Sequence, residues 1–300
     1  MLENIAFLDN HFSARDIHEK TSKAPEPAIF AGLKAIHQIT RLCNAAKFDA
    51  VTLHKPIEDR TVKGDPTDTA LLRFSEVLSV PGLGIDTAQL LQFWTKHFEI
   101  PFNSRNKWAL TVAVPNDEKH ENSGWMLVKG GPDVLFSSCS SVLQCDGTSV
   151  PFGPNERQRM STIQNEWSSE GKRVLALWVS RSWHQGRCTP KHTSCSCRKS
   201  LDGIKLGLPA NTMEELMYSE MHDLTLVGLV GLRDPPREDV SSAIKTIRRA
   251  GVRVFMVTGD FKLTAVAIAR QVKGPSYSTC DHPFIMCILS PGWHCLTRAN

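Results

Sequence analysis

The feature that most restricts the fold is the stretch formed by residues 125–133, where an apolar strand pattern stops at a glycine pair. Lys129 lies at the end of this strand. Gly130 and Gly131 have no Cβ atom, so they tolerate φ > 0 and let a ligand approach the backbone. Pro132 then fixes φ at the start of a helix. The stretch predicts a strand, a turn and a helix, with a lysine suited to a phosphate or a flat ring. The alternative is an ordinary turn with a solvated lysine.

Length and charge limit the class of protein. The 300 residues suit one large domain or two ordinary ones, and 41% hydrophobic with 22% charged residues is typical of a globular chain. A net charge of +4, from 35 basic and 31 acidic residues, is too small to indicate nucleic-acid binding. The basic residues also form no stripe interleaved with aromatic ones. We therefore expect no nucleic-acid partner.

No apolar run approaches the ~20 residues that span a bilayer, and the N-terminus has no basic region of a signal peptide. The nine cysteines are an odd number, which we interpret as reduced cytosolic thiols. Cys188, His192, Cys195 and Cys197 do not have one of the strong zinc spacings. We favour a surface loop there and expect no metal site, although metal binding by this group stays open.

The first half of the chain alternates helical and strand patterns. Expected helices cover residues 31–46, 86–97 and 155–169, and expected strands cover 107–114, 124–129 and 172–178. The strand at 107–114 alternates large apolar with small or polar residues, which is typical of a half-buried strand. Residues 99–107 are expected to form a turn, and residues 1–30 read as irregular.

One helix start in this half is marked clearly. Asp65 suits the N-cap, Pro66 the first helical position, and Asp68 the third position of a capping box. Asp68 is thus explained by the positive end of the helix dipole alone. That explanation does not exclude a second role in a ligand site.

From residue 224 the pattern changes to strand–helix–strand–helix. Residues 224–230 form a nearly continuous apolar run, which is typical of a buried parallel strand. A helix opens at residues 234–237, with Asp234 as its cap, and a strand at 252–257 is followed by a helix at 262–272. Ligands bind at the carboxyl ends of such strands, so Thr258, Gly259 and Asp260 are expected at a site that holds a phosphoryl group.

Three motifs share one family resemblance. Residues 99–107 (Glu-Ile-Pro-Phe-Asn-Ser-Arg-Asn-Lys), 128–133 and 256–260 together resemble P-type cation-transporting ATPases of the sodium/potassium alpha-subunit type, including fungal relatives. The resemblance covers roughly residues 1–274. It implies an α/β chain: an α+β nucleotide-binding domain with an antiparallel sheet over residues 1–222, then part of a Rossmann-like, haloacid-dehalogenase-type phosphorylation domain over 223–274. Residues 275–300 have no assignment.

The resemblance also implies roles for individual residues. In the family, positions matching Asp68, Phe102, Lys107, Lys129, Gly130 and Arg173 contact ATP. Phe102 would stack on adenine, Asp68 would reach its amino group, and Arg173 would reach the phosphates. From the residues alone, ordinary core is the preferred interpretation of Phe102, and Arg173 could equally be a solvated strand-edge cation. Asp234 and Arg237 match the hinge between the two domains and complete the ATP set. Thr258, Gly259 and Asp260 match the catalytic group at the transferred phosphate.

The function implied for the family is ATP hydrolysis coupled to cation (Na⁺/K⁺) transport through an aspartyl-phosphate. ATP and Mg²⁺ are the implied cofactors, with Mg²⁺ arriving on the nucleotide, and the transmembrane and actuator domains of a whole pump are the implied partners. Neither the Asp-Lys-Thr-Gly-Thr nor the Gly-Asp-Gly-x-Asn-Asp motif of the family is present.

We therefore expect a cytosolic fragment of a membrane pump that does not turn over by itself. The alternative is a truncated ATP-binding module. A soluble phosphatase would need an Asp-x-Asp strand near the N-terminus, and the sequence shows none.

Overall fold

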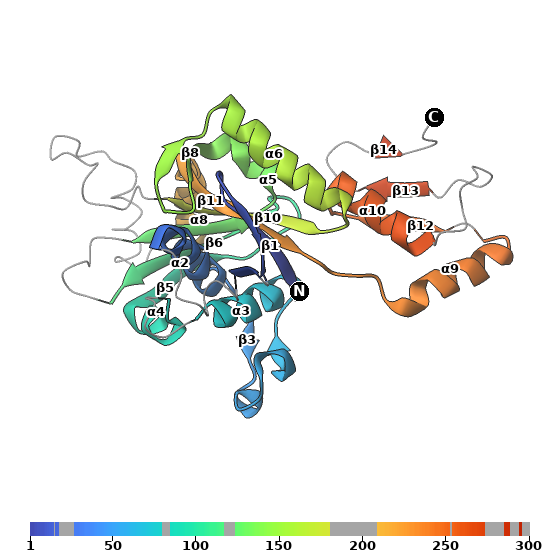
Figure 1. Cartoon of the computed structure of the whole chain (residues 1–300), viewed down its shortest axis with the longest axis horizontal. Coiled ribbons are helices and arrows are strands. Elements are labelled where there is room, and N and C mark those ends of the chain that lie inside the picture. Colours follow the sequence, from blue (N-terminus) through green and yellow to red (C-terminus); the bar gives the residue numbers. More distant parts are fainter. Residues whose placement is uncertain are drawn as a thin grey trace. The chain divides into compact units, whose positions relative to one another are not determined.

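The computed structural model describes residues 1–14, 16–17, 27–79, 85–116, 124–180, 209–252, 254–273, 285–288 and 294–295. Within it the chain forms two compact units (Figure 1). The larger unit consists of Leu2–Ser161 and Leu175–Val230. The smaller unit consists of Met1, Thr162–Val174 and Gly231–Asn300.

A large mixed sheet organises the larger unit. In the described part of the chain it has nine strands, in the order β2-β1-β11-β10-β7-β6-β5, with β8 beside β11 and β9 beside β8. The strands are β1 (Leu2–Ala6), β2 (His11–Ser13), β5 (Trp94–Ile100), β6 (Trp108–Pro115), β7 (Trp125–Gly130), β8 (Cys139–Leu143), β9 (Ser149–Pro151), β10 (Arg173–Ser180) and β11 (Leu224–Leu232). Pairing is antiparallel for β5/β6, β6/β7, β7/β10, β1/β2 and β8/β9, and parallel for β8/β11. The expected mixed α/β fold with an antiparallel sheet is confirmed.

Helices and short turns complete this unit. They are α2 (Pro27–Leu42), α3 (Pro66–Leu78), α4 (Thr87–Phe93), α5 (Pro132–Leu135), α6 (Pro154–Ser169), which continues into the smaller unit, α8 (Ala210–Ser219), and the 3-10 turns η1 (Ala50–Thr52), η2 (Ile57–Asp59) and η4 (Phe136–Ser138). A separate ribbon pairs β3 (Lys47–Phe48) with β4 (Val62–Lys63). Helix α2 packs against α3, α4 and β7, so it lies over one face of the sheet (Figure 1).

Strand β6 is buried on both faces, which corrects the half-buried strand expected from its alternating pattern. The small residues Ala109, Thr111 and Ala113 pair in register with Lys129, Leu127 and Trp125 of β7. The first of them contacts the end of α2, because the Cys43 thiol lies 3.8 Å from the Ala109 carbonyl oxygen. On the opposite face, Trp108 packs against Tyr218 of α8. The alternating pattern of β6 therefore places small side chains on one face and large ones on the other, and both faces are buried.

Two expectations about secondary structure were wrong. The helix expected at 86–97 ends at Phe93, and β5 replaces its last four residues and the start of the expected turn. Pairing with β6 from Trp94 to Ile100 satisfies the β5 backbone, and its side chains alternate between more and less exposed. Residues 1–30 were expected to be irregular, yet they supply β1 and β2. The short β1 finds its neighbour, β11, only through long-range pairing.

Strand β11 is buried along its whole length, as its apolar run predicted. However, it belongs to the large sheet and does not lie beside β12 as the change of pattern at residue 224 had suggested. Its parallel partner is β8, through Leu224–Leu226. A parallel, fully buried strand was thus expected correctly, but its sheet was not.

The smaller unit carries its own three-stranded sheet, in the order β12-β13-β14. Its elements are α9 (Glu238–Arg249), β12 (Phe255–Thr258), α10 (Lys262–Lys273), β13 (Ile285–Ile288) and β14 (His294–Cys295). Strands β12 and β13 are parallel and are connected through α10, which makes a β-α-β unit. Residues 275–300, for which the sequence offered no motif, therefore provide two strands.

Helix α9 starts later than expected. Its N-cap is Arg237, without a side-chain cap bond, so Asp234 does not cap the helix. Proline at both 235 and 236 keeps the preceding backbone out of the helical region. Glu238 and Asp239 lie in its first turn and two arginines in its last, which suits the helix dipole. None of the residues of α9 is buried, and Ile247 is 42% exposed.

None of the helices in the described ranges combines the length and the apolar character that crossing a bilayer requires.

Candidate functional site

A buried ion pair lies between the start of α3 and the end of β7. The Lys129 ammonium bonds to Oδ1 of Asp68, and the two residues are only 7% and 5% exposed. The other carboxylate oxygen accepts a hydrogen bond from the backbone N–H of Ala45 at 2.9 Å. Both oxygens of Asp68 therefore already have partners inside the protein.

The helix start at α3 forms as predicted, with one difference. Asp65 accepts from the backbone N–H groups of Thr67 and Asp68 at 2.9 and 3.0 Å, which is an N-cap. In a full capping box, Asp68 would turn back to the N-cap residue. Here its carboxylate faces Lys129 and Ala45, because the buried ammonium is the stronger partner.

The turn after α2 holds this arrangement in place. The Asn44 amide donates to the carbonyls of Thr40 (2.9 Å) and Asp68 (3.0 Å), and its oxygen accepts from Ala46 N–H at 2.8 Å. These bonds end α2 at Leu42, earlier than the expected residue 46. They also aim the Ala45 N–H at the Asp68 carboxylate.

A second lysine ties the same turn to the sheet. Lys96 of β5 donates to the Asn44 carbonyl at 2.7 Å and to Oε1 of Glu99 at 2.9 Å. Thr111 of β6 donates to the same Glu99 oxygen at 3.3 Å. Cys43 is buried beside this network, and burial raises the pKa of its thiol, which keeps it neutral. No local sequence pattern predicted the contact of Lys96 with the Asn44 carbonyl.

The turn between β5 and β6 presents an aromatic ring and a cation. Phe102 is 60% exposed, so the possibility that it is ordinary core is wrong. Lys107 adopts φ of 60°, and its N–H donates to the Asn103 carbonyl at 2.8 Å. Its ammonium lies 3.6 Å from Oδ2 of Asp133, at the start of α5. The left-handed backbone at a non-glycine residue marks a constrained turn.

A contact distant in sequence supports that turn. Asn106 donates to the hydroxyl of Tyr218 on α8, a residue 112 positions away. The Tyr218 ring packs edge-on against Trp108 at 5.2 Å. Sequence patterns missed Tyr218, because only the folded sheet brings α8 to the start of β6.

The two glycines after β7 serve packing. A Cβ atom on Gly130 would lie 2.5 Å from the Lys107 carbonyl oxygen and 2.7 Å from Trp108 Cα. Gly131 has φ of −69°, and Gly130 is likewise not among the positive-φ residues. The φ > 0 that the sequence allowed is therefore not used. Gly130 instead permits β6 and the Lys107 turn to approach β7 closely.

The remaining expected site residues lie in the smaller unit. Arg173 donates from Nε to Oδ1 of Asp260 at 3.1 Å, and the Thr258 hydroxyl donates to Oδ2 of Asp260, also at 3.1 Å. The Thr258 oxygen in turn accepts from the Asp260 N–H. Gly259 is exposed, with nothing within 4 Å of the place of a Cβ atom. The structure thus joins Arg173 to the motif at residues 258–260.

Asp234 and Arg237 are exposed and do not join this group in the structure. Arg237 pairs with Asp239 at 2.8 Å, within its own helix start. Among the described residues, no group of three or more His, Cys, Asp or Glu side chains could hold a metal ion. The group of Cys188, His192, Cys195 and Cys197 lies outside the described residues.

These features define a class of protein: a mixed α/β domain with a largely antiparallel sheet. The sheet carries a buried lysine–aspartate pair, and a turn of the same domain presents an exposed aromatic ring and a second lysine. A family model described as P-type ATPase, cytoplasmic domain N, matches residues 32–239. The chain therefore belongs to the P-type ATPase family.

Curated relatives agree with this assignment. The sodium/potassium-transporting ATPase subunit alpha-A of Artemia franciscana is 32% identical over 242 residues, covering 80% of this chain and 21% of that protein. The potassium-transporting ATPase alpha chain 2 of Oryctolagus cuniculus is 33% identical over 241 residues, covering 79% and 19%. Its counterpart in Homo sapiens is 32% identical over 273 residues, covering 89% and 23%. The chain thus spans about a fifth of the length of these relatives.

Proposed function

We propose that this chain is the ATP-binding part of a P-type ATPase and that Phe102 and Lys107 form the face that receives the nucleotide. The observation that carries the proposal is the exposed Phe102 ring on a turn held from both sides. An exposed aromatic face beside a cation suits a purine triphosphate. Stacking a base on such a ring contributes about 1–3 kcal/mol.

Lys129, Asp68 and Gly130 are proposed to belong to the same site. Since Lys129 and Asp68 neutralise each other in a buried position, they serve as a fixed floor against which adenine packs. Both carboxylate oxygens of Asp68 already accept a hydrogen bond, from Lys129 and from the Ala45 N–H. The expected contact with the adenine amino group would therefore use a second lone pair on one of these oxygens. Lys107 is less buried, and its 3.6 Å separation from Asp133 lets it turn towards a phosphate.

In the smaller unit, Arg173, Thr258, Gly259 and Asp260 are proposed to hold the phosphoryl end of ATP. Gly259 has open space beside its backbone, and α10 begins three residues later with its positive dipole end. The ion pair of Arg173 with Asp260, at 3.1 Å, keeps the arginine beside this motif. Asp234 and Arg237 are proposed as hinge residues between a nucleotide-binding domain and a partial, haloacid-dehalogenase-type phosphorylation domain.

The whole protein is proposed to couple ATP hydrolysis to cation transport, with Na⁺ and K⁺ suggested by the names of the relatives. Mg²⁺ is proposed to enter with the nucleotide phosphates, which supply oxygen ligands. Transmembrane and actuator domains would be its partners, at the cytosolic face of a membrane. The alternative is a module that binds ATP without turning it over.

Calorimetric titration of the 300-residue chain with ATP tests the nucleotide face. Phe102→Ala should weaken ATP binding at least fivefold, since stacking is lost. The change should leave stability nearly unaltered, because the ring is already exposed. Leu53→Ala removes a 49% exposed side chain elsewhere and should leave affinity within twofold. Equal ATP affinity in the Phe102 variant and the unmodified chain would exclude Phe102 from the site.

Phosphate release from MgATP tests the lack of turnover that both functional alternatives predict for the 300 residues. The 300 residues alone should bind ATP and release no phosphate, because no aspartate of the family's phosphorylation motif is present in them. Release above background would contradict the module. Hydrolysis of a generic phosphate ester would instead favour a phosphatase.

A further inference from the structure

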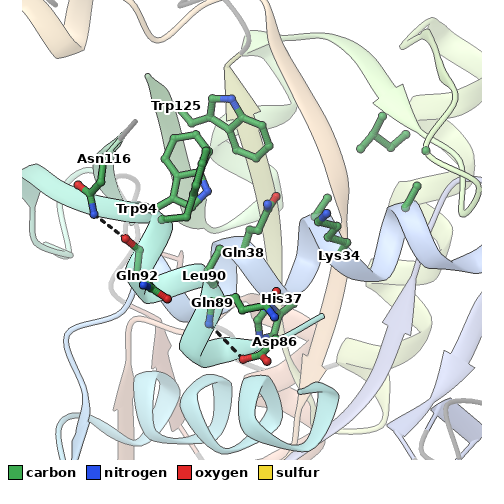
Figure 2. Close-up of a pocket in the computed structure, with 15 residues that line it drawn as sticks. Lys34, His37, Gln38, Asp86, Gln89, Leu90, Gln92, Trp94, Asn116 and Trp125 are labelled. Carbon is green, nitrogen blue, oxygen red and sulfur yellow. Dashed lines mark hydrogen bonds between the residues drawn. The ribbon is translucent and has the colours of Figure 1, made fainter. Parts of the chain in front are cut away.

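A cavity of about 820 Å³ lies in the larger unit, between α2, α4 and the ends of β5 and β7 (Figure 2). Its volume falls within the ~300–1,000 Å³ typical of small-molecule sites. None of the residues assigned to the nucleotide face lines it. The cavity is therefore a feature that the proposed ATP site does not use.

One wall of the cavity is aromatic. The rings of Trp94 on β5 and Trp125 on β7 lie 5.0 Å apart and are tilted by 42°. Phe93 packs edge-on against Trp94 at 5.4 Å. Between the two strands, β6 places the small Ala113 in register with Trp125, which leaves room for the rings to meet. A flat ligand gains both area burial and favourable ring geometry on such a wall.

The wall opposite carries amides. Gln38 extends from α2 towards the strands that bear the tryptophans, as Figure 2 shows. Its side chain is only 8% exposed, and it lines the cavity. An amide edge on a bound molecule would satisfy both its donor and its acceptor.

The charges around the cavity favour a neutral ligand. Lys34 and Asp86 contribute one charge of each sign. Asp86 also caps α4, accepting from the N–H groups of Ala88 and Gln89 at 2.8 and 3.1 Å. His37 is buried and bonded to Thr87 at 3.0 Å, and burial lowers its pKa to about 4, so it is uncharged near neutrality.

The cavity is separate from the Asp68–Lys129 pair although both lie on the α2 face of the sheet. Trp125 and Lys129 are four positions apart on β7, and thus on the same side of the strand but about 13 Å apart. Along α2, Gln38 belongs to the cavity and Cys43 follows the other end of the helix, beside Lys129. The two places share a helix and a strand but no side chain.

We propose that this cavity is a second ligand site, which takes a neutral, planar heteroaromatic molecule with an amide or lactam edge. The flat face of the ligand packs on the rings of Trp94 and Trp125, and its amide edge forms hydrogen bonds with the Gln38 side chain. The site is independent of the proposed ATP face.

The test uses the unmodified 300-residue chain and quinolin-2-one, a neutral bicyclic lactam, followed by the indole N–H signals in a ¹H–¹⁵N spectrum. Saturable shifts are expected for Trp94 and Trp125 and not for Trp167, which lies in the smaller unit. Naphthalene has the same shape without the amide and should bind at least fivefold more weakly. Absence of saturable shifts, or equal affinity for the two compounds, overturns the proposal without any variant.

Variants then locate the contacts. Gln38→Leu should weaken quinolin-2-one binding at least fivefold. Gln164→Leu, a buried glutamine on α6 that does not line the cavity, should leave it within twofold. Phe102→Ala should lower ATP affinity without changing affinity for quinolin-2-one. If Phe102→Ala weakens the binding of both ATP and quinolin-2-one, the compound occupies the nucleotide face, which contradicts a second site.

Discussion

The buried pair of Asp68 and Lys129 makes a sharp prediction about stability. Both side chains are 8% exposed, and the pair joins the start of α3 to the end of β7. Replacing Lys129 by Met keeps the length of the side chain but removes its charge. Replacing Asp68 by Asn keeps its shape and leaves an oxygen for the Ala45 N–H. Each single change leaves the other charge buried without its partner.

The expected magnitudes follow from that burial. Removing one partner of a buried ion pair costs about 3–5 kcal/mol, because the remaining ion stays desolvated. Replacing both partners together costs far less, about 1 kcal/mol, since no charge is left inside. Asp68→Asn and Lys129→Met should therefore be strongly non-additive, with a coupling of at least about 2 kcal/mol.

Urea unfolding at 25 °C measures these free energies, with tryptophan fluorescence and far-UV circular dichroism followed together. Lys63 provides the control, because its contact with Asp49 at 3.7 Å is exposed, with 79% of the lysine side chain accessible. Lys63→Met should alter stability by no more than about 0.5 kcal/mol. Additive effects of Asp68→Asn and Lys129→Met would refute the argument, since independent groups cannot form a mutually neutralising pair.

The same cycle separates folding from binding. Lys129→Ala is expected to weaken ATP binding clearly, but a destabilised chain would also bind less. The Asp68→Asn, Lys129→Met double variant restores a neutral interior and should fold. If it still binds ATP as tightly as the unmodified chain, Lys129 serves only the fold. If binding stays weak, the Asp68–Lys129 pair belongs to the nucleotide site.

Two further predictions concern single positions. His37 has a pKa of about 4 in the folded chain, against 6.5 ordinarily. Between these two pH values the unfolded state binds more protons than the folded state. Stability is therefore lost as pH falls from 6.5 towards 4, by up to about 3 kcal/mol. Urea unfolding at pH 7 and 4.5 should show this loss reduced in His37→Gln. Gly130→Ala should destabilise the chain by about 1–3 kcal/mol, because its methyl group would overlap the Lys107 carbonyl. Gly259→Ala, which meets nothing within 4 Å, is the control and should change stability by less than about 1 kcal/mol.

Local signals in the sequence predicted the elements that depend on local physics. The N-cap at Asp65 and the end of β7 at the glycine pair both form as expected. The nine-residue β11 was predicted from its apolar run. In each case the preference is contained within a few neighbouring residues.

What the sequence did not predict depends on partners distant along the chain. Strand β5 was not predicted, because residues 94–97 continue the helical pattern of the preceding residues. They form a strand because they pair with β6. The sheet to which β11 belongs was also missed, since an apolar run does not identify its neighbours. In the candidate site, the contact of Asn106 with Tyr218 and the support from Asn44 have no local pattern at all.

The candidate nucleotide face illustrates how these two kinds of information combine. Sequence placed Phe102, Lys107 and Lys129 in one site through motifs, but assigned them similar tasks. The structure separates those tasks by burial: Lys129 is enclosed with its counterion, whereas Phe102 is 60% exposed. A buried pair contributes mainly to the shape of the site, because its charge is already neutralised. An exposed ring loses water when a base stacks on it, and so contributes mainly to affinity. Changes at Phe102 should therefore report on binding, and changes at Lys129 first on folding.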